Sequence, residues 1–184
     1  MRIRTTVTTV LLLAATATAC TGGGSGTTGA GASGPSGAEA LTLGTGAHWK
    51  DVDGDGSHIS ATTTAVSYTQ PAEGVRLPTN LADFPDSEWA VLEVRTCADA
   101  DSTNVIVAQS PWTLRLKDGT EVKPLGLKGY GVPAPAYPVS AGTVRPGGCL
   151  RGKITFGVAE GSRPDSIVYD VQRRPAVTWS VPRA

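Results

Sequence analysis

Short runs of β-branched and apolar residues, separated by Gly, Pro, Asn and Asp, make up most of the chain after its first 40 residues. Residues 58–69 (HISATTTAVSYT) are rich in Thr and Val. Residues 88–98 (EWAVLEVRTCA) alternate, so that Ala90, Leu92 and Val94 lie on one face. A period of two is typical of a half-buried strand, and no long stretch keeps the helical period of 3.6 residues. The pattern therefore predicts an all-β domain.

A hairpin is predicted in the segment WTLRLKDGTEVKPL. Its Asp118-Gly119 pair separates two alternating runs, and a two-residue turn of the primed type needs residues that accept a positive φ. We expect Leu114, Leu116 and Val122 to face the core.

Four further runs complete the pattern, and in the longest of them Leu150, Ile154, Phe156 and Val158 share one face. The runs are residues 104–109, 149–158, 166–171 and 176–181. Seven or eight short strands joined by turns indicate an Ig-like antiparallel β-sandwich, with a small barrel as the alternative.

The N-terminus has the layout of a secretory signal. Arg2 and Arg4 precede the apolar stretch VTTVLLLAATATA, which is too short to span a bilayer by itself. Because Ile3 separates the two arginines, the twin-arginine export signal is not matched.

The sequence ATAC, which ends at Cys20, resembles the lipobox of bacterial lipoproteins, in which the cysteine is lipidated and becomes the first mature residue. Ala17 stands where leucine is usual in that family. Residues 21–38 consist almost wholly of Gly, Ser, Thr and Ala, which predicts a flexible linker. Such a linker suits a lipid-anchored domain that must clear a membrane surface. The alternative is an ordinary secretion signal, cut after ATA, that releases the protein.

Charge and cysteine content fit an exported domain. The chain has 16 basic and 16 acidic residues, and removing Arg2 and Arg4 with the signal leaves 14 basic residues and a net charge of −2. No long basic run is present, so we expect no nucleic-acid binding. The remaining cysteines, Cys97 and Cys149, are expected to form one disulfide that joins two strands across the sandwich.

Several segments together resemble a known family. Behind the lipobox and the Gly/Ser tether, WAVLEVRTCADADSTNV, TVRPGGCLRGKITFGV, RPDSIVYD and VTWSVP are similar to the telokin-like, Ig-related domain of exported actinobacterial lipoproteins, described as immunoprotective extracellular proteins. The resemblance covers most of residues 45–182. It implies a cell-envelope β-sandwich of unassigned molecular role and supplies no catalytic residues. The order Cys97, Trp112, Cys149 also repeats that of Ig domains, although Gly147 stands where those domains carry a tyrosine.

The stretch DVDGDGSH partly matches a calcium loop. Asp51, Asp53 and Asp55 fit positions 1, 3 and 5 of an EF-hand loop, and Gly56 fits position 6. Position 12, however, is Thr62 in place of the bidentate glutamate. Because Asp side chains also cap turns, we expect a polar turn, with calcium binding by the three aspartates as the alternative.

No catalytic residues are identified, and we expect that the protein is not an enzyme. His48 and His58 bracket the aspartates and would form a transition-metal site only if the loop of residues 48–58 brought them together. Neither histidine lies near a GxSxG turn that would present a serine nucleophile. Asp83 and Asp86 have ordinary loop spacing, although either could add a carboxylate to a calcium site.

Residues 124–148 form a Gly- and Pro-rich stretch that is long for a sandwich connection and contains Tyr130 and Tyr137. Long loops in compact domains are often functional, and tyrosines on a stiff backbone make good contact surfaces. The alternatives are a partner-binding loop and a segment that folds back over a sheet edge with both rings packed.

These patterns predict a signal peptide in residues 1–19, a lipidated Cys20 with its linker in residues 20–40, and a β-sandwich domain in residues 41–184. The expected function is that of a lipid-anchored binding or envelope-component module on the extracytoplasmic side of the cell membrane. Its partner would be an unknown envelope or extracellular component, and no cofactor is expected. The alternative is a secreted protein that binds a metal or small ligand at the Asp-rich loop 48–58.

Overall fold

The computed structural model describes residues 39–77, 86–172 and 174–183. The described residues contain ten strands and no helix, and therefore no helix that could cross a membrane. The strands are β1 (Gly46–Val52), β2 (His58–Thr69), β3 (Ser87–Ala98), β4 (Val105–Val107), β5 (Trp112–Arg115), β6 (Glu121–Val122), β7 (Gly142–Val144), β8 (Cys149–Ala159), β9 (Ser166–Tyr169) and β10 (Val177–Ser180). The predicted signal peptide, Cys20, nearly all of the linker, and Asp83 lie outside the described residues.

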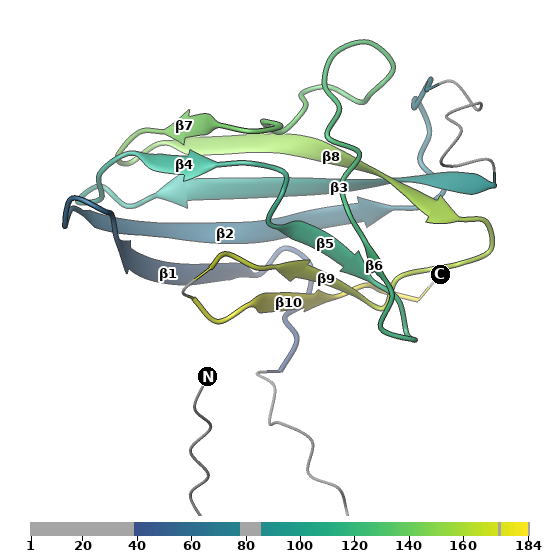
Figure 1. Cartoon of the computed structure of the whole chain (residues 1–184), viewed down its shortest axis with the longest axis horizontal. Helices are drawn as coiled ribbons and strands as arrows, with labels where there is room; N and C mark the ends of the chain where they lie inside the picture. Colours follow the sequence, from purple (N-terminus) through teal and green to yellow (C-terminus); the bar gives the residue numbers. More distant parts are fainter. Residues whose placement is uncertain (1–38, 78–85, 173, 184) are drawn as a thin grey trace, which may run out of the picture. The chain divides into compact units, whose positions relative to one another are not determined.

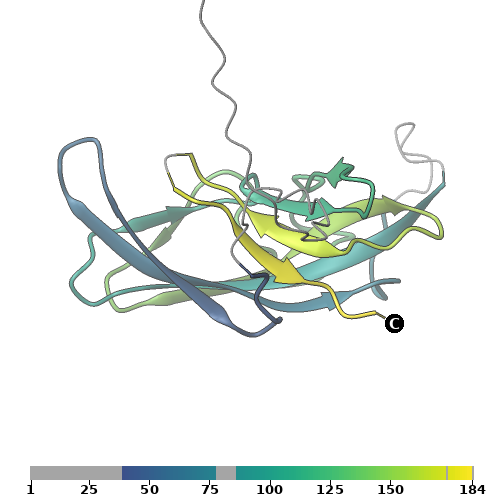
Figure 2. The ribbon, with the colours of Figure 1, turned by 90° about the horizontal axis from the view of Figure 1, so that it is seen from below.

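The strands form two facing antiparallel sheets, as Figures 1 and 2 show. The first sheet, here called sheet I, has the order β1-β2-β3-β8. Sheet II has the order β10-β9-β5-β6, and β4 pairs with β7 in a separate two-stranded ribbon. This arrangement confirms the predicted all-β, Ig-like antiparallel sandwich.

The core lies between the two sheets and follows the predicted alternation. Leu92, Ile154 and Phe156 from sheet I are fully buried, as are Leu114 and Ile167 from sheet II. Alternate residues of β3 and β8 point to the outer face, since each strand has a period of two. The faces of both long strands were therefore predicted correctly.

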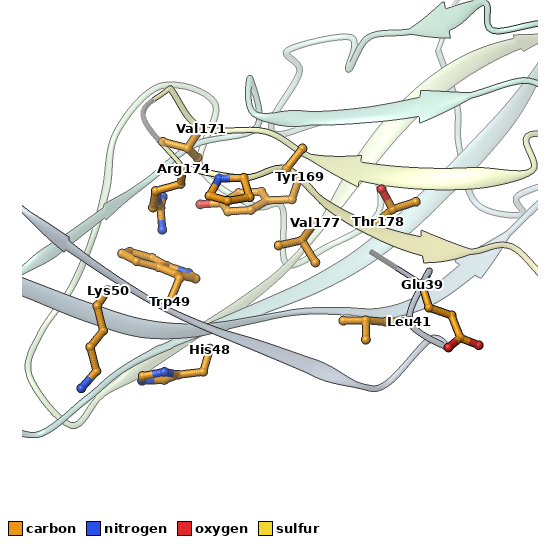
Figure 3. Close-up of a pocket in the computed structure, with 12 residues that line it drawn as sticks. Glu39, Leu41, His48, Trp49, Lys50, Tyr169, Val171, Arg174, Val177 and Thr178 are labelled. Carbon is orange, nitrogen blue, oxygen red and sulfur yellow. The ribbon is translucent and has the colours of Figure 1, made fainter. Parts of the chain in front are cut away.

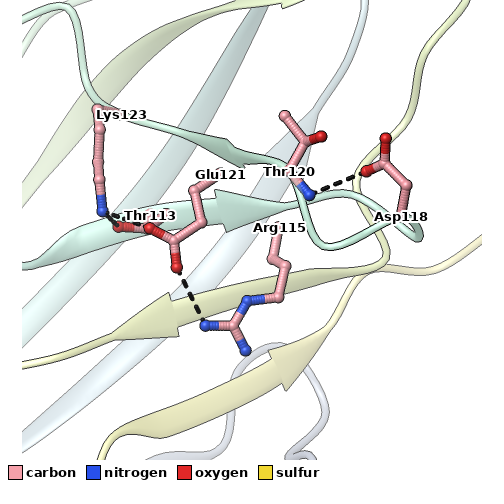
Figure 4. A network of polar contacts seen from close by, with 6 residues as sticks. All are labelled: Thr113, Arg115, Asp118, Thr120, Glu121 and Lys123. Carbon is pink, nitrogen blue, oxygen red and sulfur yellow. Dashed lines mark hydrogen bonds and ion pairs between the residues drawn. The ribbon is translucent and has the colours of Figure 1, made fainter.

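The turn after β5 differs from the prediction. The N–H of Leu116 donates to the carbonyl of Thr120 at 2.8 Å, so the loop has three residues instead of two. The N–H of Gly119 donates to the carbonyl of Leu116, and Gly119 has a φ of 87°. A tight turn followed by one positive-φ residue is the usual three-residue hairpin, in which only the glycine needs that conformation. Asp118 instead accepts the N–H of Thr120 at 2.9 Å (Figure 4).

Glu121, beside this turn, lies between two cations (Figure 4). Its carboxylate contacts Lys123 at 2.8 Å and Arg115 at 3.2 Å. The hydrogen bonds from Lys123 and then Arg115 hold the pKa of Glu121 below its ordinary value. Because all three side chains are exposed, we assign these pairs little weight in stability.

The Tyr-containing loop covers the edge of β8, as one of the two alternatives predicted, but only Tyr137 is packed, whereas that alternative expected both rings to be. Tyr137 donates its N–H to the carbonyl of Lys153, and Lys153 donates to the carbonyl of Pro135. The backbone passes so close to β8 that a Cβ at Gly152 would lie 2.7 Å from the nitrogen of Tyr137. A glycine is therefore required at position 152, in the PGGCLRGKITF segment.

Residues 46–52 form β1, whereas residues 48–58 were predicted to form a loop. β1 pairs with β2 from Gly46↔Thr64 to Val52↔His58 without a bulge. The alternation of apolar and polar residues is weak in the short segment GAHWKDV, because only Ala47 and Trp49 of its inward positions are apolar. As a result, β1 adds an edge strand that the sequence pattern did not predict.

Candidate functional site

A groove lies between β1 and the β9–β10 hairpin, at the open side of the sandwich (Figure 3). Its volume is about 530 Å³. The lining, here called the β1–β10 groove, is mainly apolar and consists of Glu39, Leu41, His48, Trp49, Lys50, Tyr169, Val171, Arg174, Pro175, Ala176, Val177 and Thr178. A concave apolar site with a few polar groups is the usual form of a binding site in a protein.

The centre of the groove is a stacked pair, Trp49 and Arg174. The guanidinium carbon of Arg174 lies 3.6 Å from the centroid of the Trp49 ring. Trp49 faces inward because it occupies an inward position of β1, and its Nε1 donates to Thr63 Oγ1 at 2.9 Å. This hydrogen bond fixes the orientation of the Trp49 ring, and one face of the ring contacts the guanidinium of Arg174.

Arg174 has few polar partners in this position. Its side chain is only 13% exposed, and its nearest carboxylate oxygen is Asp51 Oδ2, 3.7 Å from Nε. Nε itself is buried and has no hydrogen-bond partner among the described residues. Burial raises the pKa of the adjacent Tyr169 hydroxyl, while the charge of Arg174 acts in the opposite direction. A largely buried cation with one distant counter-ion favours a ligand group that brings negative charge or π-electron density.

Two polar side chains, His48 and Lys50, lie on the outer side of β1. His48 Nε2 is 2.8 Å from Asp99 Oδ2, and this hydrogen bond is the main cause of the lowered pKa of Asp99. Lys50 forms no ion pair with any described residue. The outer rim of the β1–β10 groove therefore carries a histidine that is hydrogen-bonded to a carboxylate and a lysine outside any ion pair of the described residues.

A row of buried polar groups leads from Trp49 into the domain. Thr63 Oγ1, which accepts from Trp49, lies 3.3 Å from Thr96 Oγ1. Thr96 Oγ1 in turn lies 3.0 Å from the hydroxyl of Tyr137. The backbone carbonyl of Tyr137 accepts from Gln109 Nε2 at 2.7 Å. The indole in the groove and the loop that covers β8 are thus joined through one hydrogen-bonded row.

The aspartates of DVDGDGSH have separate roles. Asp53 and Asp55 lie in the β1–β2 turn, where the N–H of Gly54 donates to Asp53 Oδ1 and the N–H of Ser57 to Asp55 Oδ1. Hydrogen bonds from Ser57, first from its side chain and then from its N–H, lower the pKa of Asp55. Asp51 lies within β1 and faces Arg174. The described residues contain no group of three or more His, Cys, Asp or Glu side chains placed to hold a metal ion.

The two histidines are not brought together. His58 lies opposite Val52, and His48 lies opposite Thr62. Four residues along a strand separate these positions by about 13 Å, at the usual rise of 3.3 Å per residue. The hairpin therefore does not support a transition-metal site built on both histidines.

Of the two predicted contact tyrosines, only Tyr130 is available. Its side chain is 92% exposed at the tip of the loop, whereas Tyr137 is 1% exposed and belongs to the core. The prediction of Tyr137 as a partner-binding residue was wrong, because its side chain is part of the buried core and its hydroxyl is hydrogen-bonded to Thr96.

Cys97 and Cys149 form a disulfide, but it does not cross the sandwich. They are directly opposite residues on β3 and β8, neighbours in sheet I. The next pair, Ala98 and Gly148, is hydrogen-bonded, so the cysteines occupy the position where opposite side chains are closest. Their Cα atoms lie 4.0 Å apart. The bond therefore lies on the outer face of sheet I, unlike the inter-sheet disulfide of antibody domains.

Sequence reasoning missed the three residues at the centre of the groove, Trp49, Tyr169 and Arg174. An aromatic residue between two polar residues, as in His48-Trp49-Lys50, was a signal that could have marked an edge strand with one inward ring. No local pattern pointed to Arg174, which follows β9 by five residues and meets Trp49 from the opposite sheet.

The fold and the groove define the class of this protein as a β-sandwich with a candidate binding groove at its open edge. No protein-family model matches the sequence, and no curated protein does. Among solved structures, the secreted protein MPT63 from Mycobacterium tuberculosis is similar, with a TM-score of 0.56, 18% identity, and coverage of 78% of this chain and 97% of that chain.

The similarity to MPT63 supports the Ig-related fold implied by the sequence resemblance, and at 18% identity it supports the fold alone. The yjhA protein from Bacillus subtilis also matches, with a TM-score of 0.44, 13% identity, and coverage of 70% of this chain and 79% of that chain. We base no argument on the second match.

Proposed function

We propose that this protein is a lipid-anchored binding module on the extracytoplasmic side of the cell membrane, and that the β1–β10 groove is its ligand site. The observation that carries the proposal is the groove of about 530 Å³, with the Trp49–Arg174 stack at its centre. Cys20, at the end of ATAC, would carry the lipid, and residues 21–38 would act as the tether.

The groove chemistry suits an apolar ligand with a negatively charged or π-rich group. Leu41, Val171 and Val177 supply apolar contacts, and Arg174 supplies the buried cation. Transfer of a ligand from water to such a surface is favourable by about 25 cal/mol for each Å² of apolar area removed from water.

The groove is tested with the dye 1-anilinonaphthalene-8-sulfonate, an aromatic anion. The mature chain carrying Cys20→Ser should bind one dye molecule saturably, and Val177→Asp should weaken binding at least tenfold, because it places a carboxylate in the apolar lining. Ile106→Asp is the matched control, since Ile106 is 62% exposed and does not line the groove. Equal dye affinity in Val177→Asp and the unsubstituted protein would show that the groove is not the site.

The anchor is tested separately in cells. Cys20→Ala should release the protein or leave the precursor uncut, whereas the natural chain should partition into the detergent phase. If Cys20→Ala still partitions with membranes, the anchor is not at Cys20. The secreted alternative predicts that both forms remain in the aqueous phase.

A further inference from the structure

We propose that the edge of β1 at His48 and Lys50 binds an extended peptide of a partner protein as an added strand, with the apolar side chains of the peptide in the β1–β10 groove. This inference rests on the proposed function, because it names the ligand class of the same groove. Addition of a strand to a sheet edge is a general mode of peptide recognition, in which the main chain supplies affinity and alternate side chains supply specificity.

The backbone of β1 supplies the first argument. The N–H of Asp53 donates to the carbonyl of Ser57, so Asp53 and Ser57 form a hydrogen-bonded pair. Along an antiparallel pair of strands, opposite residues alternate between hydrogen-bonded and non-hydrogen-bonded pairs. His48 and Lys50 therefore fall at positions where N–H and C=O point away from β2. No described residue forms a hydrogen bond to these backbone groups. The edge thus offers two adjacent pairs of donors and acceptors to an incoming strand.

Unlike β1 at His48 and Lys50, the edge strands β8 and β10 are covered by other described segments of the chain. The far edge of sheet I, β8, is covered by the segment ending at Tyr137, through bonds to Lys153. The β10 edge of sheet II is covered by Leu41, which donates to Thr178 and accepts from Ser180. Uncovered edges invite pairing with other chains, and proteins usually protect them. In the described part of the chain, no such segment pairs with β1 at His48 and Lys50.

The groove decides the chemistry of the added strand. Side chains of the peptide that lie beside Trp49 would point into the groove toward Val177 and Leu41, so they should be apolar. The intervening side chains would lie beside Lys50 on the outer face, where a side chain of opposite charge on the neighbouring strand is favourable. The expected ligand is an extended peptide that alternates apolar and acidic residues.

Charge also disfavours a second copy of this chain as the occupant. If two copies of β1 paired in the antiparallel register centred on Lys50, Lys50 would lie opposite Lys50 of the copy. Pairs of like charge directly opposite each other are destabilising. Self-association in that register is therefore disfavoured.

The test uses a soluble, acetylated and amidated heptapeptide of alternating glutamate and valine. Isothermal titration calorimetry with the mature Cys20→Ser chain should show binding at one site. A lysine/valine peptide should bind at least tenfold more weakly. Two N-methylated versions of the acidic peptide, one methylated on every glutamate and one on every valine, identify the donors. One version should lose at least tenfold in affinity and the other little, because only alternate N–H groups face β1.

Lys50→Pro provides the matching change in the protein. Proline removes the outward N–H at position 50 but no bond to β2, and edge strands tolerate it at such positions. Lys50→Pro should weaken peptide binding at least tenfold, whereas Lys50→Ala should weaken it less than about fivefold, the value of one charge pair. Thermal melting checks that Lys50→Pro is folded. If it is not, the methylated peptides and hydrogen exchange of the His48 and Lys50 amides decide.

The outcomes separate this inference from the proposed function. If the dye binds the groove but the peptide neither binds nor slows exchange of the His48 and Lys50 amides, strand addition is wrong and the groove remains a ligand site. If neither probe binds, both proposals fail. If the protein forms dimers that Lys50→Pro abolishes, the edge binds a second copy and the proposed occupant is wrong.

Discussion

The guanidinium of Arg174 lies 3.6 Å from the ring centroid of Trp49, although the two residues are far apart in sequence and come from opposite sheets. This contact joins β1, the edge of sheet I, to the hairpin connection of sheet II. It therefore ties together the two walls of the β1–β10 groove.

The Trp49–Arg174 stack should contribute measurably to folding stability. In a double-mutant cycle with Trp49→Leu and Arg174→Met, we expect a coupling free energy of about 1–2 kcal/mol, the range for a cation–π contact removed from water. Urea denaturation of the four proteins gives the value. A coupling below about 0.3 kcal/mol would mean that the stack only fills space.

Tyr137→Phe should lower the free energy of unfolding by about 1 kcal/mol, because it removes the buried hydroxyl that is bonded to Thr96. In a domain of this size the melting temperature would fall by about 3 °C. Tyr130→Phe is the control, and it should change stability by less than about 0.5 kcal/mol because Tyr130 is exposed. Equal effects in the two variants would contradict the burial of Tyr137.

Loss of the disulfide should cost far more. The Cys97–Cys149 bond closes a loop with a sequence separation of 52, for which loop-closure entropy corresponds to about 4 kcal/mol. Since domains have only about 5–15 kcal/mol of stability, Cys97→Ser with Cys149→Ser should leave a marginally folded protein in urea denaturation. Mass spectrometry of the unreduced protein after alkylation checks the bond itself, and two alkylated cysteines would disprove it.

The β1–β2 turn should tolerate alanine at one glycine and not at the other. Gly56 has a φ of 86°, so Gly56→Ala should destabilise the protein by about 1–2 kcal/mol. Neither glycine has a neighbour within 4 Å of a built Cβ, so crowding plays no part. Gly54→Ala, two residues earlier, should change stability by less than about 0.5 kcal/mol. Thermal melting compares the variants, and similar effects would show that the turn differs from the one described.

Calcium should leave the protein unaffected. Asp53 and Asp55 accept N–H groups of their own turn, and Asp51 faces Arg174, so the three carboxylates do not converge. We expect the melting temperature to agree within about a degree with chelator and with millimolar calcium. A ligand at one hundred times its dissociation constant adds about 2.7 kcal/mol, which would raise the midpoint by several degrees. A rise of that size would establish the metal-binding alternative.

Local pattern was enough to predict most of the sheets. The period-two alternation of residues 88–98 placed Leu92 and Val94 in the core, because the faces of a strand depend only on neighbouring residues. The same locality explains why the hairpin at Asp118 was found but its type was wrong. Loop length depends on the register of β5 against β6, and adjacent turn residues do not specify that register.

The candidate site could not be predicted in the same way. The groove needs Trp49 on an edge strand, Arg174 beyond β9, and the two brought together by the packing of one sheet on the other. Strand order decides each of these, and it is set by contacts between residues distant in the chain. For this reason the sequence offered the aspartates and tyrosines, whose signals are local, as site residues.

By itself the sequence determined the all-β class, most strand positions, the core faces and the two cysteines available to pair, because these depend on short-range periodicity and composition. Only the tertiary structure decided that Cys97 and Cys149 bridge neighbours in sheet I, that Tyr137 is buried against Gly152, and that Trp49 meets Arg174. Those contacts join segments 15 to more than 100 residues apart, and each forms only once the chain has brought its two segments together, so no pattern of neighbouring residues specifies them.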